Sequence, residues 1–345
     1  MDLNEEEGDS TWEFYSQHVL TTAAGLLLLL YIFIKGRKAE TSEQDAKKAD
    51  EVSKPDVLGD YAQCHQPDCV RCKPRKDNHL LWNERLGEFL EKQCSENQLF
   101  LKDLCASFRQ DTLGGCMDGV SDKADIEEKT IKLQNPMVYS YPILQGYPWY
   151  DIEAVSSKAH RSDVHILKDK FGVIKQEFES IYARYLEGDS SGWSVNNVPS
   201  GSWNVFHLFN QGRRIEDNCL KCARTVKVLE KLETFMQGVS FGYACFSVLQ
   251  PGSHISPHYG PCNIRLRCHL GIQIPDNCSL TVAGECKQWK EEDCLLFDDS
   301  FLHEAVNANE GSVNGIDGSR VILMVDLWHP DLSDLEKEAF RDVFC

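Results

Sequence analysis

The sequence predicts a mixed, mainly β fold, a sandwich or jelly roll preceded by a helical region and a membrane-anchor helix. Three observations predict it. After Trp193, short segments rich in β-branched and aromatic residues recur between Gly, Pro, Asn and Asp. Before it, apolar residues recur at helical spacing, most clearly over 162–186. Near the N-terminus, the stretch from Val19 to Ile34 carries no charge.

The length and composition are those of a globular protein with an attached segment. The chain has 345 residues, of which 42% are hydrophobic and 10% aromatic, enough to fill one large or two ordinary cores. Its 54 acidic and 36 basic residues give a formal charge of −18. Because binding to a phosphate backbone needs Lys and Arg concentrated on one face, this balance argues against a nucleic-acid partner.

An acidic tail and an uncharged stretch open the chain. We assign 1–17 to the tail and 18–35 to a transmembrane anchor, since the uncharged stretch is only a little shorter than the ~20 residues that span a bilayer. A cleaved signal peptide fits less well. Its n-region should be basic and a small-residue cleavage site should follow, whereas Lys35-Gly36-Arg37-Lys38 follows here.

Two features disagree on the orientation of this anchor. The basic residues follow the span, which by the positive-inside rule places the C-terminal part in the cytosol. Asn277-Cys278-Ser279, however, is a glycosylation sequon in an expected hairpin turn, and Asn277 can be glycosylated only in the lumen. The residues alone leave the orientation open.

The rest of the chain divides into four regions. They are a polar linker or stalk with a cysteine cluster (36–78), a helical region expected to pack on the core (79–190), the β domain (191–331) and a terminal helix (332–345). In the terminal helix, Ser333 and Glu336 occupy capping-box positions. One further helix is expected near 223–235. The expected strands are 202–209, 241–249, 263–274, 279–283, 294–298 and 320–328.

Fifteen cysteines are many for a reduced cytosolic enzyme, and the odd count leaves at least one thiol unpaired within a monomer. Two interpretations of the clustered ones remain open. They form disulfides in an oxidising lumen, or two Cys-x-x-Cys pairs hold a zinc ion in the cytosol. The clustered residues are Cys64, Cys69, Cys72, Cys219 and Cys222, of which the last four would hold the zinc.

The chemistry concentrates between His258 and His303, which stand 45 residues apart on a segment that reads as strands. A ferrous site that activates O2 commonly uses two histidines and a carboxylate two residues after the first, and here that position is Gly260. A metal held by the two histidines alone keeps an extra open position. Two ordinary core or surface histidines are the plainer interpretation, and Asp298 or Asp299 is a candidate partner behind the ligands.

Cationic groups surround these histidines. On 263–274 the apolar residues alternate with Arg265, Arg267 and His269, so that one face of the strand is core and the other wet or functional. If the co-substrate is 2-oxoglutarate, its distal carboxylate needs a bidentate donor, the task a guanidinium does best. Arg320 starts a strand 17 residues after His303 and is the candidate for that task. Further candidate donors are Trp203, Ser247 and His269.

A string of motifs resembles one family. The residues that carry it are Ser202-Trp203, Gln211-Gly212-Arg213-Arg214, Ser247-Val248-Leu249, His258-Tyr259-Gly260-Pro261, Asn263 to Gly271, Phe297-Asp298-Asp299-Ser300-Phe301 with His303-Glu304, and Arg320 with Val325 to Pro330. Over roughly 195–330 this pattern is similar to the catalytic domain of aspartyl/asparaginyl β-hydroxylases. The cluster from Cys64 to Cys72 looks like their membrane-anchored relatives, the aspartate β-hydroxylase domain-containing proteins.

The resemblance implies a cupin-like double-stranded β-helix that uses O2 and binds Fe(II) through His258 and His303, with glycine in the usual carboxylate position. It implies hydroxylation of the β-carbon of Asp or Asn in disulfide-rich protein modules, and hence a lumenal domain in the endoplasmic reticulum or secretory pathway. Arg265 is a candidate contact for an acidic substrate. The positions that match 2-oxoglutarate-binding ones are Trp203, Ser247, Arg267, Cys268, His269 and Arg320.

Two other functions fit parts of the sequence. The long helical-repeat region of the full hydroxylase is replaced here by about 160 residues of stalk and helices, which leaves the substrate unidentified. A catalytically silent, membrane-anchored interaction module with a structural cysteine or zinc site is the alternative to the enzyme. Histidines that hold zinc structurally fit poorly, because structural zinc sites use four protein ligands.

Overall fold

A computed structural model of the protein describes residues 81–82, 84–89, 134–155, 157–196, 198–311 and 318–345. The helices in it are a short one within 81–89, α4 (Lys158–Asp169), α5 (Phe171–Leu186), α6 (Glu216–Lys221), α7 (Ala223–Leu229) and α8 (Asp334–Phe344). The strands are β1 (Trp149–Tyr150), β2 (Trp193–Asn196), β3 (Trp203–Asn210), β4 (Arg213–Arg214), β5 (Ala244–Leu249), β6 (Ser253–His258), β7 (Arg265–Gln273), β8 (Cys278–Val282), β9 (Glu285–Lys287), β10 (Cys294–Phe297), β11 (His303–Asn307) and β12 (Arg320–Trp328).

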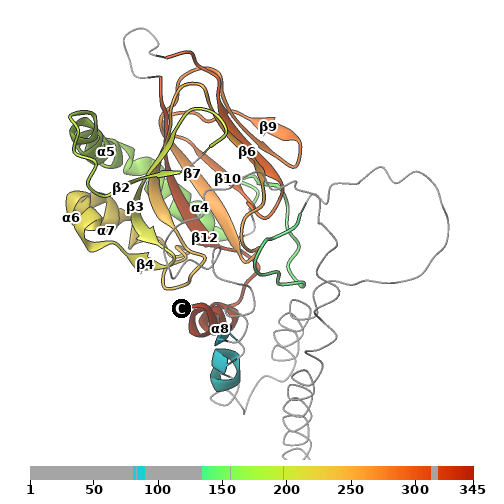
Figure 1. Ribbon diagram of the computed structural model, residues 1–345. Helices are drawn as coiled ribbons and strands as arrows, with labels where there is room; N and C mark the ends of the chain where they lie inside the picture. Colours follow the sequence, from blue (N-terminus) through green and yellow to red (C-terminus); the bar gives the residue numbers. More distant parts are fainter. Residues whose placement is uncertain (1–80, 83, 90–133, 156, 197, 312–317) are drawn as a thin grey trace, which may run out of the picture. The chain divides into compact units, whose positions relative to one another are not determined.

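Two antiparallel sheets form the β domain (Figure 1). The larger has the order β1-β10-β7-β12-β5-β3-β2, with β4 paired to β3, and the smaller has the order β6-β11-β8-β9. From β5 onward the chain passes between the sheets, and only β8 and β9 follow each other in the same one: β5, β7, β10 and β12 belong to the larger sheet, while β6, β8, β9 and β11 belong to the smaller. This alternation is the connectivity of a jelly roll, so the predicted mainly β fold is confirmed.

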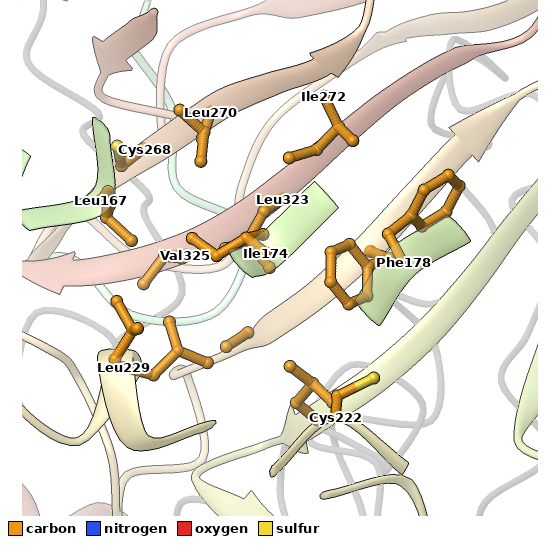
Figure 2. Packing of buried hydrophobic residues seen from close by; sticks show 14 of the residues in the cluster. Leu167, Ile174, Phe178, Cys222, Leu229, Cys268, Leu270, Ile272, Leu323 and Val325 are labelled. Carbon is orange, nitrogen blue, oxygen red and sulfur yellow. The ribbon is translucent and has the colours of Figure 1, made fainter. Parts of the chain in front are cut away.

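Helices cover the outer face of the larger sheet. Figure 1 shows α5, α6 and α7 together on one side of it. The residues of β7 that face them are apolar and alternate along the strand, and they pack with Leu323 and Val325 of β12 against Leu167 and Phe178 of the helices (Figure 2). Because these side chains are buried, the outer face of the sheet is the main core and leaves the inner face for other tasks.

The inner face looks toward the smaller sheet and mixes apolar with polar side chains. Its apolar part includes Phe297 of β10 and Met324 of β12, which belong to one cluster with Leu280 and Val282 of β8 in the smaller sheet. Its polar part includes His269 on β7, which is 7% exposed. The space between the two sheets is therefore the place where buried polar groups gather.

A third cluster closes one end of the domain. Trp82 of the short helix meets Phe344 of α8 at a ring-centroid distance of 4.9 Å, and both lie in an aromatic cluster with Phe241. The capping box predicted at the start of the terminal helix is confirmed: the Ser333 hydroxyl accepts from the Glu336 backbone N–H, and the Glu336 carboxylate accepts from the Ser333 backbone N–H at 2.7 Å.

Several predicted boundaries were wrong. The helix expected over 162–186 is two helices that meet at Lys170. The helix expected near 223–235 is α7, which begins at residue 223 but ends at residue 229, and α6 before it was not expected. The turn at Asn277 is exposed and left-handed (φ 59°), but it leads from β7 to β8 in the other sheet and closes no hairpin. Glycosylation at Asn277 stays a prediction.

The N-terminal predictions fall outside the described residues. These are the acidic tail (1–17), the anchor (18–35), the stalk (36–78) with Cys64, Cys69 and Cys72, and most of the first helical region. Within the described part, none of the helices is both long and apolar enough to span a membrane.

Candidate active site

The two candidate metal-ligand histidines face each other across neighbouring strands of the smaller sheet. His258 ends β6, His303 begins β11, and the two residues are partners in the antiparallel register. Their ring centroids lie 4.1 Å apart at an interplanar angle of 49°. The register of the pair slips between His303 and Ala305, and such a bulge re-aims the side chain beside it. The strand pairing thus brings together two imidazoles that are 45 residues apart in the chain.

Backbone carbonyls orient both rings. The Nδ1 of His258 lies 2.8 Å from the Ser256 carbonyl oxygen, and the Nδ1 of His303 lies 2.8 Å from that of Phe301. A carbonyl can only accept, so each Nδ1 carries the proton and each Nε2 carries the lone pair that a metal needs. Burial lowers the pKa of His303 to about 4, which keeps this ring neutral and ready to ligate at neutral pH. At both Nδ1 atoms the partner is thus a backbone carbonyl, where a carboxylate of Asp298 or Asp299 was a candidate.

The glycine after the first histidine has a steric cause. A Cβ on Gly260 would lie 2.4 Å from the carboxyl carbon of Asp299 and 2.5–2.6 Å from its oxygens. The Gly260 N–H also donates to the Asp299 carbonyl at 2.6 Å. An Asp or Glu at position 260 therefore has no room, and the described residues contain no group of three His, Cys, Asp or Glu side chains that could hold a metal. Position 260 therefore adds no third candidate ligand to the two histidines.

Asp299 forms ion pairs with the two arginines of β7. It pairs with Arg265 and, at 3.0 Å, with the Nη1 of Arg267, while Asp326 of β12 accepts from Arg265 Nη1 and from Arg267 Nε at 2.8 Å each. Although burial opposes it, the two guanidiniums hold the pKa of Asp299 well below its usual range. The four side chains form a neutral, buried charge cluster that ties β7, β12 and the loop before His303 together.

This cluster corrects one prediction about Arg265. Its side chain is 0% exposed and is bonded by Asp299, Asp326 and the carbonyl of Phe241, so it cannot contact a substrate. Arg267 does lie on the inner face, but its guanidinium is bonded to the same two carboxylates. Its predicted role at the cofactor stays a prediction.

Arg320 differs from these arginines because no carboxylate in the described part of the chain pairs with it. The described residues include no acidic side chain in an ion pair with it; Nη1 lies 3.4 Å from the Ser247 oxygens, and the buried Nε has no hydrogen-bond partner. Burial lowers its pKa to about 10. A buried guanidinium without a counter-charge is costly, which indicates a site made for an anionic ligand.

His269 provides a second donor that lacks a partner. Its Nδ1 accepts from the indole N–H of Trp289 at 3.2 Å, so its proton resides on Nε2, and that buried atom has no hydrogen-bond partner. Burial, together with Arg267 and Arg320, holds the pKa of His269 well below its usual range. The neutral ring therefore presents an N–H group to the interior.

Trp289 links the two orphan donors and was missed in the sequence. Its ring centroid lies 4.8 Å from the guanidinium carbon of Arg320, and its ring is stacked on that of His269 at an interplanar angle of 26°. From there, ring contacts continue through Phe297, 4.9 Å from His269 and 5.8 Å from His303. The one available signal was a tryptophan inside a polar, Lys-rich stretch.

The remaining predicted residues divide between the two faces of the larger sheet. Trp203 donates its indole N–H to the Ser247 hydroxyl at 2.9 Å, so both lie beside Arg320. Cys268 does not. It packs in the cluster on the helix-covered face, because side chains alternate along β7, and the prediction that it contacts the cofactor was wrong.

The described cysteines are free thiols. Cys219 and Cys222 are both 0% exposed within the main core, and the Cys219 thiol donates to the Leu208 carbonyl. Burial raises the pKa of Cys222 to about 12. Packing therefore accounts for both, and the prediction that they form a disulfide was wrong. The zinc site stays a prediction, because Cys69 and Cys72, like Cys64, lie outside the described residues.

The buried histidines predict a loss of stability in acid. Burial lowers the pKa of His303 and of His329 from 6.5 to about 4, so between these values the unfolded chain binds more protons than the folded protein. Each such proton costs about 1.4 kcal/mol per pH unit. Asp298 offsets the effect of one histidine. Burial raises its pKa from 3.8 to about 7, so between these values the folded protein binds the extra proton.

The urea midpoint of the metal-free protein should accordingly fall as the pH is lowered from 6.5 to 4. His329→Gln should reduce the dependence of stability on pH by the equivalent of nearly one proton. His165→Gln, at an exposed position, should leave this dependence unchanged. Equal slopes in wild type and His329→Gln would show that His329 is not kept neutral by the fold.

The chain is similar to proteins of one family. The sequence pattern of that family, described as Aspartyl/Asparaginyl beta-hydroxylase, matches residues 168–330. Aspartate beta-hydroxylase domain-containing protein 2 of Xenopus tropicalis is 40% identical over 286 residues, which are 83% of this chain and 71% of that protein. Aspartyl/asparaginyl beta-hydroxylase of Homo sapiens is 40% identical over 141 residues, which are 40% of this chain and 17% of that protein.

Solved structures resemble it only distantly. AviO1 from Streptomyces viridochromogenes has a TM-score of 0.31 at 13% identity and covers 48% of this chain and 86% of its own. A Pseudomonas putida prolyl-4-hydroxylase has a TM-score of 0.27 at 11% identity and covers 46% and 87%. The assignment of the fold therefore depends on the strand order, and the assignment of the family depends on sequence similarity. By that similarity, the chain belongs to the aspartyl/asparaginyl beta-hydroxylase family.

Proposed function

We propose that the protein is an Fe(II)- and 2-oxoglutarate-dependent dioxygenase that hydroxylates protein side chains, of the Asp or Asn β-carbon class. The observation that carries the proposal is the joint presence of a two-histidine pair and a buried arginine without a counter-charge. His258 and His303 lie 4.1 Å apart by ring centroids, and Arg320 is 1% exposed with an unpartnered Nε. Neither feature has a use in packing alone.

The donor set fits the two groups. Two neutral imidazoles that present Nε2 suit Fe(II), and the glycine at position 260 keeps a third protein ligand away. Arg320, the Ser247 hydroxyl and the His269 Nε2–H are donors that suit the carboxylates of an oxoacid. When bound, iron and 2-oxoglutarate supply the O2 activation that inserts a hydroxyl group, with succinate and CO2 as co-products.

The chain's own residues hold and orient these reactants. Arg320 would anchor the distal carboxylate, and Trp289, whose ring centroid lies 4.8 Å from the guanidinium carbon, would keep the guanidinium in place. Apolar side chains of the inner face, among them Phe297 and Met324, exclude bulk water from the site. The buried charge cluster keeps β7 and the loop before His303 in register.

Substrate and location complete the proposal. The substrate is a protein or peptide, expected to be disulfide-rich, and residues 18–35 anchor the enzyme in the membrane with its C-terminal domain in the lumen of the secretory pathway. The name of the similar human protein, aspartyl/asparaginyl beta-hydroxylase, supports the Asp/Asn class. Glycan on Asn277 in cells would support the lumenal orientation, and unmodified Asn277 would oppose it.

Metal analysis of the purified full-length protein tests the enzyme against the interaction module. We expect about one iron per chain after reconstitution with Fe(II), lost on His258→Ala. If instead zinc is retained through that change and lost on Cys69→Ser, the chain is the catalytically silent module.

Trp289 offers a sharper test of the oxoacid pocket. Trp289→Phe keeps an aromatic ring beside Arg320 but removes the N–H that fixes the tautomer of His269. We expect 2-oxoglutarate to bind about 10-fold more weakly to the metal-loaded variant, since one hydrogen bond to a charged group is worth about 1.5–3 kcal/mol. Trp193→Phe, in the aromatic cluster beside Tyr185, is the matched control. Unchanged affinity, with His269 still protonated on Nε2 by 15N NMR, would contradict this role.

A further inference from the structure

Residues 134–150 lie before the part of the chain that matches the family pattern, which begins at residue 168. They nevertheless run along two loops of the candidate active site. One loop, residues 259–263, follows His258; the other, residues 298–302, precedes His303. We call residues 134–150 the clasp.

The clasp begins on the loop before His303. The side-chain amide of Gln134 donates to the Ser300 hydroxyl at 3.0 Å and to the Asp298 carboxylate at 3.2 Å. The next residue, Asn135, donates its backbone N–H to the Ser300 carbonyl at 3.0 Å. Side-chain and backbone bonds thus fix the same short stretch of this loop.

The clasp then crosses to the loop after His258. Met137 donates its N–H to the Gly260 carbonyl, and Val138 and Tyr139 both donate to that of Pro261, each at 2.9 Å. Tyr141 and Asn263 exchange two bonds, 2.7 Å from the Tyr141 N–H to the Asn263 side chain and 2.9 Å in return. A single segment is therefore bonded to both loops.

The clasp finally returns to its starting point. Asp298 donates its N–H to the Pro148 carbonyl at 3.3 Å, and β1 adds to the edge of the larger sheet beside β10. This return passes close to Gln134 at Gly146, where a Cβ would lie 2.4 Å from the Gln134 amide nitrogen and 2.7 Å from an Asp298 oxygen. Glycine is needed there because the two passes of the clasp touch.

One clasped loop holds the carbonyl that orients His303, and the other clasped loop follows His258 and is bonded to the first. Phe301 follows Ser300 directly, and its carbonyl accepts from the Nδ1 of His303 at 2.8 Å. Gly260 stands two residues after His258 and donates to the Asp299 carbonyl at 2.6 Å. A shift of the Ser300 region would thus move the carbonyl that aims His303 and the contact between the loops.

We propose that the clasp positions His258 and His303 relative to each other, and that Gln134 is a positioning residue for the metal centre. This inference rests on the proposed function and extends the working site beyond the region that the family pattern matches. Gln134 contacts no metal or substrate in this account; it acts through Ser300 and the Phe301 carbonyl.

The test uses full-length protein and Mn²⁺, a redox-stable probe for the Fe(II) site. Gln134→Met keeps the length of the side chain but removes its two amide donors, and Gln145→Met, at an exposed position of the clasp, is the matched control. We expect Gln134→Met to weaken Mn²⁺ binding about 10-fold, in line with other changes behind metal ligands. In the metal-free protein, amide hydrogen exchange of residues 299–303 should become faster. Gln145→Met should change neither.

The outcomes separate the clasp from the metal site. Unchanged Mn²⁺ affinity and exchange in Gln134→Met, or equal changes in Gln145→Met, overturn the inference. So does a loss of affinity accompanied by faster exchange throughout β5, β7 and β12, since that is a global effect. If Gln134→Met does not fold, Gly146→Ala, which pushes one methyl group against the same amide, replaces it with the same expectations. If wild type binds no Mn²⁺, the proposed function fails, and the exchange of 299–303 still decides on the clasp.

Discussion

Arg320→Met is expected to weaken the binding of 2-oxoglutarate to the metal-loaded protein by at least about 100-fold. The variant removes the guanidinium that has no carboxylate partner among the described residues, and bonds between charged groups are worth about 1.5–3 kcal/mol each. The metal-free variant should be no less stable than wild type, because it loses a buried charge that no acidic side chain of the described residues compensates. Calorimetric titration and urea unfolding measure the two effects.

The combination of these two results is the informative part. Replacing an arginine with a structural role would lower the stability of the protein, whereas replacing one that binds a ligand lowers only the affinity for that ligand. Arg214→Met, on a surface arginine paired with Glu216 and Glu230, should change neither the affinity nor, by more than about 1 kcal/mol, the stability. An Arg320→Met protein that binds 2-oxoglutarate normally but unfolds more easily would place Arg320 in the structure and outside the pocket.

Asp326→Ala is expected to lower the free energy of unfolding by about 3–5 kcal/mol. Asp326 is 0% exposed and accepts hydrogen bonds from both Arg265 and Arg267, so its removal leaves two buried guanidiniums to share Asp299 alone. The loop before His303 should also lose order, because Asp299 belongs to it. Urea unfolding of the metal-free protein measures the effect.

Asp293→Ala is the matched control for this change. Asp293 also pairs with a basic residue, Lys168, at 2.8 Å, but its side chain is 46% exposed. Water therefore replaces most of what the pair provides, and we expect a cost of no more than about 1 kcal/mol. Similar losses in the two variants would mean that the charge cluster around Asp326 contributes no more than a surface pair.

Local sequence patterns predicted the larger sheet well and the smaller one poorly. The strands β3, β5, β7, β10 and β12 were all expected within a few residues, because they are apolar on the helix-covered face. The strands β6 and β11, which carry the two histidines, were not expected. Both alternate between buried and more exposed residues and contain many polar ones, so neither stands out from a loop in the sequence.

The site was predictable where a residue type is out of place, and not where partners come from distant strands. The surplus arginines and histidine on β7 indicated a functional face. Arg320 was identified because a guanidinium is the best donor to the distal carboxylate of 2-oxoglutarate. The bonds from Arg265 to Asp299 and Asp326 join residues that are 34 and 61 positions apart in the chain, and no local pattern contains such pairings. The tautomer of His269, set by Trp289, has the same origin.

The central claim is that the histidine pair and Arg320 form one working site. Turnover of 2-oxoglutarate tests it most directly: purified full-length protein with Fe(II), O2 and 2-oxoglutarate, with succinate measured against His303→Ala and Arg320→Met, alone and across a panel of Asp- and Asn-containing, disulfide-rich peptides. We predict succinate above background from wild type, increased by a hydroxylated peptide and absent from both variants. No succinate from iron-loaded wild type across the panel, or equal succinate from His303→Ala, would contradict the account.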